Sequence, residues 1–233
     1  MIFIKELKRY WYINLKDYKK SIIPVLLNIV IVLLFYMFIN NTMTLNYIVA
    51  YSTVWILLTS QLGLMQEFLS DAKAKRIKYY FIGNRSITQS YLSRYIIFCI
   101  KYSFLYYIFI KFTYFVGIIQ YNIRIYDVLL LCIGLVAVFF VNYILSLIMI
   151  LNKRLQIVLN LFRCLVFYFL ISSGSKILPL SYAIHNLGNN FFVNAHFKEI
   201  DGVIIILNSL FYVLAGYYFC FMITKLLKYK IVE

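Results

Sequence analysis

Six runs of apolar residues, each long enough to cross a lipid bilayer, limit how this chain can fold more than any other feature. A crossing helix needs roughly 17–25 mainly apolar residues. The hydrocarbon interior offers no hydrogen-bond partners, so a crossing segment must satisfy its own backbone groups, as a helix does. The fifth run is the shortest and contains Arg163. The predicted spans are Ile22–Ile39, Leu45–Met65, Tyr95–Ile119, Val128–Leu151, Leu155–Ile171 and Val203–Ile223.

The composition agrees with an all-α integral membrane protein. Apolar residues make up 64% of the chain and charged residues 13%, whereas soluble domains contain about 45–50% and about 25%. The net charge of +15 is therefore better explained by loops that face anionic lipid than by nucleic-acid binding. No linker or repeat divides the chain, so residues 1–233 are predicted to form one membrane domain.

The basic residues alternate between the two sides of the predicted bundle. Residues 1–21, 66–94, 152–154 and the tail after 223 hold seventeen Lys and Arg, whereas the other three connections hold three. Cytoplasmic loops of membrane proteins carry the excess of Lys and Arg. This pattern predicts cytoplasmic termini, a cytoplasmic insert at 66–94 and an outer connection at 172–202.

The N-terminal residues 1–21 have the pattern of an amphipathic helix in the membrane interface. Such a helix would turn into the first span near Pro24. An ordinary basic flank is the alternative. The apolar side is predicted to hold Phe3, Ile4, Leu7, Trp11, Leu15 and Tyr18, and the basic side Lys5, Lys8, Arg9, Lys16 and Lys19.

The insert at 66–94 mixes both charge signs with aromatic residues. Asp71 and Lys75 stand four residues apart, the spacing of neighbours on a helix. Gly83-Asn84 predicts a turn, and Ser86 or Thr88 is placed to cap a short helix leading into the third span. The insert fits either a surface for docking a protein or a solvated loop on lipid headgroups. The outer connection 172–202 contains two short apolar pieces, predicted to be re-entrant or interfacial helices.

This arrangement resembles the membrane subunit of an ABC transporter of the ABC-2 (type V exporter) class. The shared features are the N-terminal interfacial helix, six spans, an insert between spans two and three that opens with Glu67, and a long outer loop before span six. Two places depart from the family pattern: Asp71-Ala72-Lys73 stands where Gly-Thr is usual, and Asn84-Arg85-Ser86 stands where a Pro-containing turn is usual.

The resemblance implies a permease in a bacterial plasma membrane that pairs with a second membrane subunit, identical or related. Two separate cytoplasmic ATPases would bind ATP and Mg²⁺. The chain itself contains no GxxxxGK[ST] sequence, so it is expected to bind no cofactor and to be no enzyme. The implied ATPase-coupling residues are Glu67, Phe68, Asp71, Lys75, Arg76, Lys78, Tyr79 and Arg85. The implied activity is export of an amphipathic substrate, such as an antimicrobial or cytolytic peptide.

Other chemistry finds little support in the residues. His185 and His196 both lie in the outer loop, and Asp127, at the mouth of the fourth span, is the one acid near a span. Charges within spans often mark transport paths, which makes Lys111 and Arg163 candidates. For Arg163, a structural bond to the backbone or to Tyr hydroxyls of another helix is the favoured alternative. The alternative functions are the substrate-binding membrane component of an energy-coupling-factor vitamin uptake transporter, or a non-transporting immunity or sensor protein.

Overall fold

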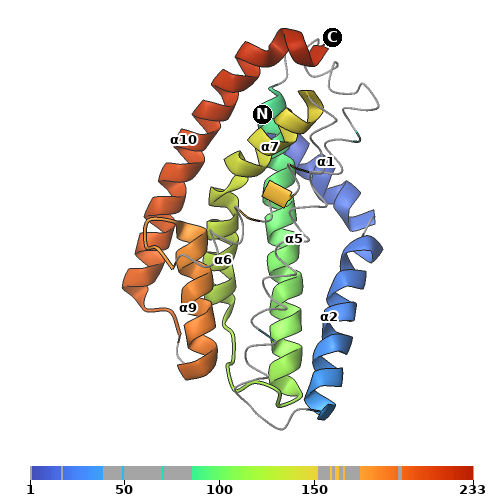
Figure 1. The fold of residues 1–233 in the computed structure, drawn as a ribbon, viewed down its shortest axis with the longest axis vertical. Coiled ribbons are helices and arrows are strands. Elements are labelled where there is room, and N and C mark those ends of the chain that lie inside the picture. The colour runs from blue at the N-terminus through green and yellow to red at the C-terminus, as the bar shows by residue number, and fades with distance from the viewer. Residues whose placement is uncertain are drawn as a thin grey trace.

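A computed structural model describes residues 2–16, 18–38, 86–151, 174–193 and 196–232, with a few isolated positions between them. Within these ranges the chain is helical and contains no strand (Figure 1). The helices are α1 (Ile2–Lys16), α2 (Tyr18–Phe38), α5 (Ile87–Phe115), α6 (Ile125–Ala137), α7 (Phe139–Leu151), α9 (Pro179–Val193) and α10 (Glu199–Val232).

Three stretches of the described chain are long and apolar enough to cross a membrane. They are Ile87–Phe115, Ile125–Ile150 and Glu199–Leu226, and they correspond to the predicted third, fourth and sixth spans. The prediction of an all-helical membrane protein is confirmed at this level. The count of six spans and the side on which the termini lie stay predictions.

The first predicted span is covered by α2, whose apolar part runs from Ile29 to Phe38. This helix already begins at Tyr18, and Pro24 lies within it. The turn predicted near Pro24 is therefore wrong, because α1 ends at Lys16. The predicted second and fifth spans lie outside the described residues, apart from isolated positions.

Helix α5 begins and ends with two recognisable caps. The Ser86 side chain accepts a hydrogen bond from the Gln89 backbone N–H at 3.4 Å, which confirms the predicted N-cap. The short helix expected before the third span is thus the first part of α5. At the other end Gly117, with φ +81°, adopts the left-handed backbone that closes a Schellman motif: Ile118 N–H donates to the Thr113 carbonyl at 2.9 Å.

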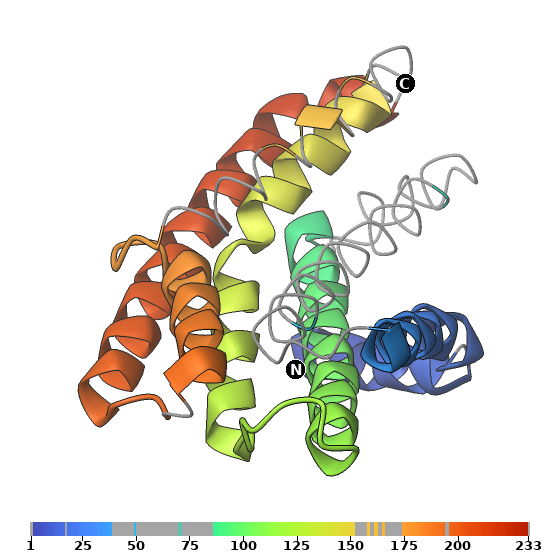
Figure 2. The same ribbon diagram turned by 60° about the horizontal axis from the view of Figure 1, so that its bottom comes forward.

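Helices α6, α7, α9 and α10 form one side of the bundle, and α7 runs beside α10 and away from α5 (Figure 2). The two short apolar pieces predicted in the outer connection form a single helix, α9, which packs on α6 and begins with Pro179. The close contact depends on Gly134, because a Cβ there would lie 3.2 Å from the Leu180 Cα and 3.2 Å from the Pro179 carbonyl oxygen. Small residues allow such close approach between membrane helices.

Helix α1 packs on α5 through polar residues. Glu6 and Tyr10 are buried. The Tyr10 hydroxyl lies 3.1 Å from Ser90 Oγ, and the Arg94 guanidinium lies 4.4 Å from the centre of the Tyr10 ring. Two members of the predicted apolar stripe, Ile4 and Trp11, are exposed. The side of α1 that faces the protein is therefore the Glu6–Tyr10 side, which hydrophobic periodicity did not predict.

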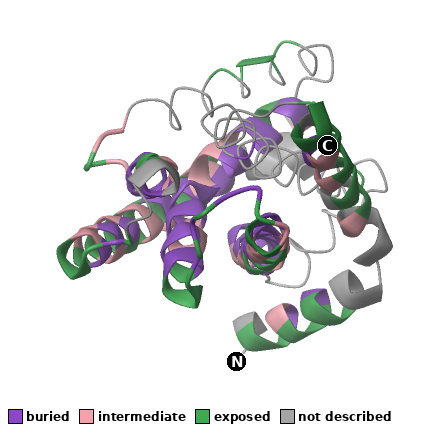
Figure 3. Ribbon diagram, turned by 90° about the horizontal axis from the view of Figure 1, so that it is seen from below, coloured by how far each residue is buried: buried purple, intermediate pink, exposed green. Residues whose placement is uncertain are grey.

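The core is mainly aromatic. Buried residues concentrate in the central helices (Figure 3), whereas many side chains of α10 between residues 199 and 226 are exposed. Tyrosine combines a large apolar ring with a hydroxyl that needs a partner when buried, so an aromatic core also carries polar contacts. The largest fully buried side chains are Tyr91, Tyr95, Tyr106, Tyr121, Tyr143, Phe109, Phe139 and Ile87.

Replacing Gly134 by Ala tests the close contact between α6 and α9. The new methyl group would press on the backbone at Leu180, which cannot rotate away, and overpacking of this kind costs about 2 kcal/mol. We expect Gly134→Ala to lower the melting temperature of the purified protein in detergent. Gly188→Ala is the matched control, because its Cβ would meet nothing within 4 Å and Ala favours a helix. Equal melting temperatures for the two variants would contradict the packing.

Candidate functional site

Most of the residues predicted to be functional lie outside the described part of the chain. This holds for all eight proposed coupling residues (Glu67, Phe68, Asp71, Lys75, Arg76, Lys78, Tyr79 and Arg85) and for Arg163. Lys111 is described. Two polar groupings elsewhere in the bundle carry the candidate site instead, one at each end of the helix pair α6–α7.

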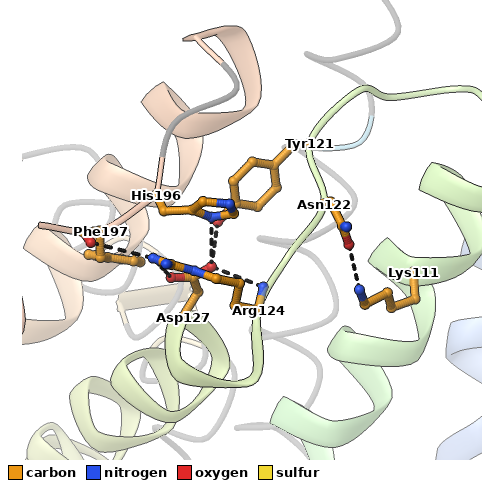
Figure 4. Close-up of polar contacts among 7 residues, drawn as sticks. All are labelled: Lys111, Tyr121, Asn122, Arg124, Asp127, His196 and Phe197. Carbon is orange, nitrogen blue, oxygen red and sulfur yellow. Dashed lines mark hydrogen bonds and ion pairs between the residues drawn. The ribbon is translucent and has the colours of Figure 1, made fainter.

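The first grouping surrounds Asp127, whose side chain is fully buried. Its Oδ2 accepts hydrogen bonds from the Tyr121 hydroxyl at 2.9 Å and from the Arg124 backbone N–H at 3.0 Å. The Arg124 guanidinium lies 3.5 Å from Oδ1, and His196 Nδ1 lies 3.4 Å from Oδ2. Figure 4 shows these side chains converging on the carboxylate. We call these four residues the outer cluster.

Local sequence explains how the outer cluster forms. Asp127 is the third residue of α6, where a carboxylate favours the positive end of the helix dipole and can bond the capping residue's N–H. The loop after Gly117 brings Tyr121 back over it. His196 comes from the segment between α9 and α10, and the neighbouring Phe197 carbonyl accepts a hydrogen bond from Arg124 at 3.5 Å.

The groups around Asp127 hold its carboxylate in one position and balance its negative charge. Burial and the charge of Asp127 raise the pKa of the Tyr121 phenol well above its ordinary value, so this phenol remains a donor. The side chains of Arg124 and His196 are 47% and 36% exposed and face solvent on their outer sides. The cluster therefore ties two connections to the start of α6 and leaves the Arg124 guanidinium partly exposed at its edge.

Lys111 anchors the same loop at another point. Its ammonium group donates a hydrogen bond to Asn122 Oδ1 (Figure 4) and lies 5.6 Å from the centre of the Tyr107 ring. These contacts give Lys111 a positioning role at the loop. Its predicted role in a substrate path stays a prediction.

A second carboxylate–tyrosine contact joins α9 to α10. The Tyr182 hydroxyl donates to Asp201 Oδ1 at 2.7 Å, and Lys176 lies 6.0 Å from the Tyr182 ring centre. The hydrogen bond to Asp201 and partial desolvation raise the pKa of Tyr182. This contact and the outer cluster lie at the same end of the bundle.

The second grouping is a line of buried side chains that join α5, α7 and α10. We call it the hydroxyl seam. Thr88, Tyr91 and Tyr95 recur at three- and four-residue steps and so share one face of α5. Each seam residue contacts at least one other. The members are Thr88, Tyr91, Tyr95, Asn142, Tyr143, Ser146 and Thr224.

The seam meets a break in a membrane-crossing stretch. Ile125–Ile150 is long enough to span, yet α6 ends at Ala137 and α7 begins at Phe139. The Tyr95 hydroxyl donates to the Leu135 carbonyl at 3.0 Å and accepts from Asn142 Nδ2 at 3.2 Å. In lipid an irregular backbone must be satisfied by the protein itself, and Tyr95 does so here.

The chemistry available to these groupings is hydrogen bonding and charge neutralisation. Among the described residues no group of three or more His, Cys, Asp and Glu could hold a metal ion. Three described cysteines, Cys99, Cys132 and Cys220, are free thiols.

Two sequence signals could have indicated these groupings. Asn142 is a strongly polar residue within an otherwise apolar run, and such residues bond across helices in membranes. Asp127 was singled out by sequence as an isolated acid, but its partner His196 lies far along the chain, which no local pattern indicates.

No protein-family model matches this chain, and no curated protein or solved structure matches it either.

Removing the charge of Asp127 should weaken the outer cluster. Asp127→Asn replaces an acceptor of charge-assisted bonds from Tyr121 and Arg124, and we expect a loss of about 2 kcal/mol in the free energy of unfolding. Asp201→Asn is the matched control, because Asp201 is less buried and accepts one recorded side-chain bond, from Tyr182. Thermal unfolding in detergent checks this. An equal or larger loss for Asp201→Asn would refute it.

The raised pKa of Tyr182 predicts a loss of stability at alkaline pH. The folded protein holds the phenol proton more tightly than the unfolded chain, so this stabilisation is complete below about pH 10 and is lost above it. Melting temperature should therefore fall less steeply between pH 9 and 11 in Tyr182→Phe than in the unaltered protein. Tyr218→Phe, at a tyrosine 67% exposed, controls for removing a hydroxyl and should leave the slope unchanged.

Proposed function

We propose that this chain is the membrane-spanning subunit of an ATP-driven transporter and that a separate cytoplasmic ATPase supplies the energy. One observation carries the proposal: the stretch Ile125–Ile150 breaks at Val138 next to a buried line of hydrogen-bonding side chains. Discontinuous helices backed by polar groups recur in membrane transporters, because they can change arrangement without exposing backbone to lipid.

The start of α5 supports coupling to a partner. Residues 87–94 belong both to the predicted cytoplasmic insert and to a 29-residue helix that crosses the bundle. A force applied to the insert would therefore be carried by continuous helix. Ser90 and Arg94 in this segment hold α1 through Tyr10, so α1 would move with it.

The proposed assembly contains two membrane subunits and two ATPases in a bacterial plasma membrane. The resemblance to ABC-2 exporters suggests export. The aromatic core, together with the predicted path residues Lys111 and Arg163, suits an amphipathic substrate such as an antimicrobial or cytolytic peptide. Within this proposal, residues 66–94 are the surface that the ATPase binds.

Co-purification with an ATPase tests this assignment. The chain would be expressed with the ABC ATPase encoded nearest to it, as the unaltered protein and as a deletion of residues 70–85, which leaves the Ser86 cap and Thr88 in place. We expect the unaltered chain to retain the ATPase in detergent and to stimulate ATP hydrolysis in liposomes, and the deletion to lose both. Lys176→Ala and Lys198→Ala remove basic residues from the connection predicted on the opposite side, and should change neither.

Two results would overturn the proposal. Retention of the ATPase by the deletion variant would show that the insert is not the coupling element. Failure of any ABC ATPase to bind the unaltered chain would favour a vitamin-uptake component or a protein that does not transport. Gel filtration and the melting temperature of the deletion variant separate lost binding from lost folding.

A further inference from the structure

The break between α6 and α7 has an unusual cause. Val138, between the two helices, has φ −92° and ψ +13°, and its N–H donates to the Leu135 carbonyl at 3.3 Å, three residues back. Val141 N–H likewise donates to the Val138 carbonyl at 3.2 Å. The local sequence LVAVFFVN contains no proline or glycine. Sharp bends without Pro or Gly arise where a side chain enters the backbone ladder.

The side chain that enters the ladder is Tyr95 from α5. Its hydroxyl bonds the Leu135 carbonyl, which belongs to α6, and the Asn142 amide, which belongs to α7. One oxygen atom thus holds both halves of the broken stretch. The Tyr95 ring is fully buried and lies 6.4 Å from the Phe139 ring at the start of α7.

Beyond the break, α7 is held more firmly by α10 than by α5. Besides the Tyr95–Asn142 bond, it contacts α5 through two long hydroxyl pairs, Tyr91–Ser146 at 3.4 Å and Thr88–Tyr143 at 3.3 Å. The Tyr91 and Tyr143 rings also meet edge to face, with 4.9 Å between their centres. Towards α10, Phe140 packs against Gly216, where a Cβ would lie 2.9 Å from the Phe140 Cβ. Phe140 also stacks on Tyr212, with 6.3 Å between ring centres and 9° between planes. The Tyr143 hydroxyl bonds Thr224 of α10.

We propose that Val138 is a hinge and that the Tyr95 hydroxyl is its latch. When the latch is released, α7 and the C-terminal half of α10 turn together away from α5, and α6 stays in place because α9 and the outer cluster hold it. This movement opens the hydroxyl seam between α5 and α7. The inference goes beyond the proposed function, because it concerns how the helices move and holds whether or not an ATPase drives the movement.

Distances between spin labels measure the movement directly. Ile148 lies ten residues beyond Val138, about 15 Å along α7, so a turn of about 15° moves a label there by about 4 Å. Labels at Phe104 and Ile148 report α5 against α7, labels at Phe104 and Leu129 report α5 against α6, and labels at Ile148 and Phe219 report α7 against α10. All four sites are exposed. In Tyr95→Phe, we expect a second distance about 4 Å longer for the first pair alone.

Two further variants distinguish the loss of the Tyr95 hydroxyl bonds from a general loosening of the bundle. Tyr102→Phe removes a buried hydroxyl two turns further along α5 and should leave all three distances unchanged. Asn142→Ala removes the other partner of the Tyr95 hydroxyl and should act as Tyr95→Phe does. An unchanged first distance in both latch variants, or an equal change in the α5–α6 pair, would overturn the proposal.

A second measurement avoids replacing the four native cysteines before labelling. Hydrogen exchange of the otherwise unaltered chain in nanodiscs should become faster at the amides of residues 138–142 in Tyr95→Phe, by a factor of about five, as expected for the loss of one hydrogen bond. Amides of α9 should exchange at an unaltered rate. Unaltered exchange at 138–142 would contradict the latch.

Discussion

Lipid gives a backbone no partner for its hydrogen bonds, and this constraint underlies most of the features of the bundle. Long helices satisfy their own backbone hydrogen bonds. The helix ends, and the break between α6 and α7, need donors and acceptors from elsewhere in the protein. Ser86 and the Schellman turn at Gly117 serve the two ends of α5. At Val138 the donor comes from a different helix, through the Tyr95 hydroxyl. The abundance of buried tyrosine follows, because tyrosine fills apolar space and still supplies a polar atom.

The two polar groupings differ in strength for physical reasons. The outer cluster is built on a buried carboxylate with charge-assisted bonds from Tyr121 and Arg124, and such bonds are the stronger kind. The hydroxyl seam uses neutral groups, several at 3.3–3.4 Å. Neutral contacts between membrane helices contribute little each. The outer end of the α6–α9–α10 side is therefore the fixed part, and the end that contains α7 is the adaptable part.

Sequence predicted the parts of the fold that depend on local pattern. The apolar runs placed the third, fourth and sixth spans, and the residue at 86 was recognised as a helix cap. Contacts between distant segments were not predictable in this way. The contact of Glu6 and Tyr10 on α1 with α5 had no signal in the hydrophobic periodicity, because it is made through polar groups. The break at Val138 could not be predicted from the residues around it, which include no proline or glycine. Its cause is Tyr95, which lies 43 positions earlier in the chain.

The length of α10 makes the protein sensitive to the thickness of its membrane. The part of this helix without charged residues, 202–224, has 23 residues, about 35 Å of helix, against a hydrocarbon layer of about 30 Å. Such a helix tilts to match its surroundings, and Figure 1 shows α10 inclined to α5. Because α7 rests on α10, a thinner bilayer would increase the tilt and draw α7 with it. The lipid composition of the membrane would thus change the angle between the helices of the bundle.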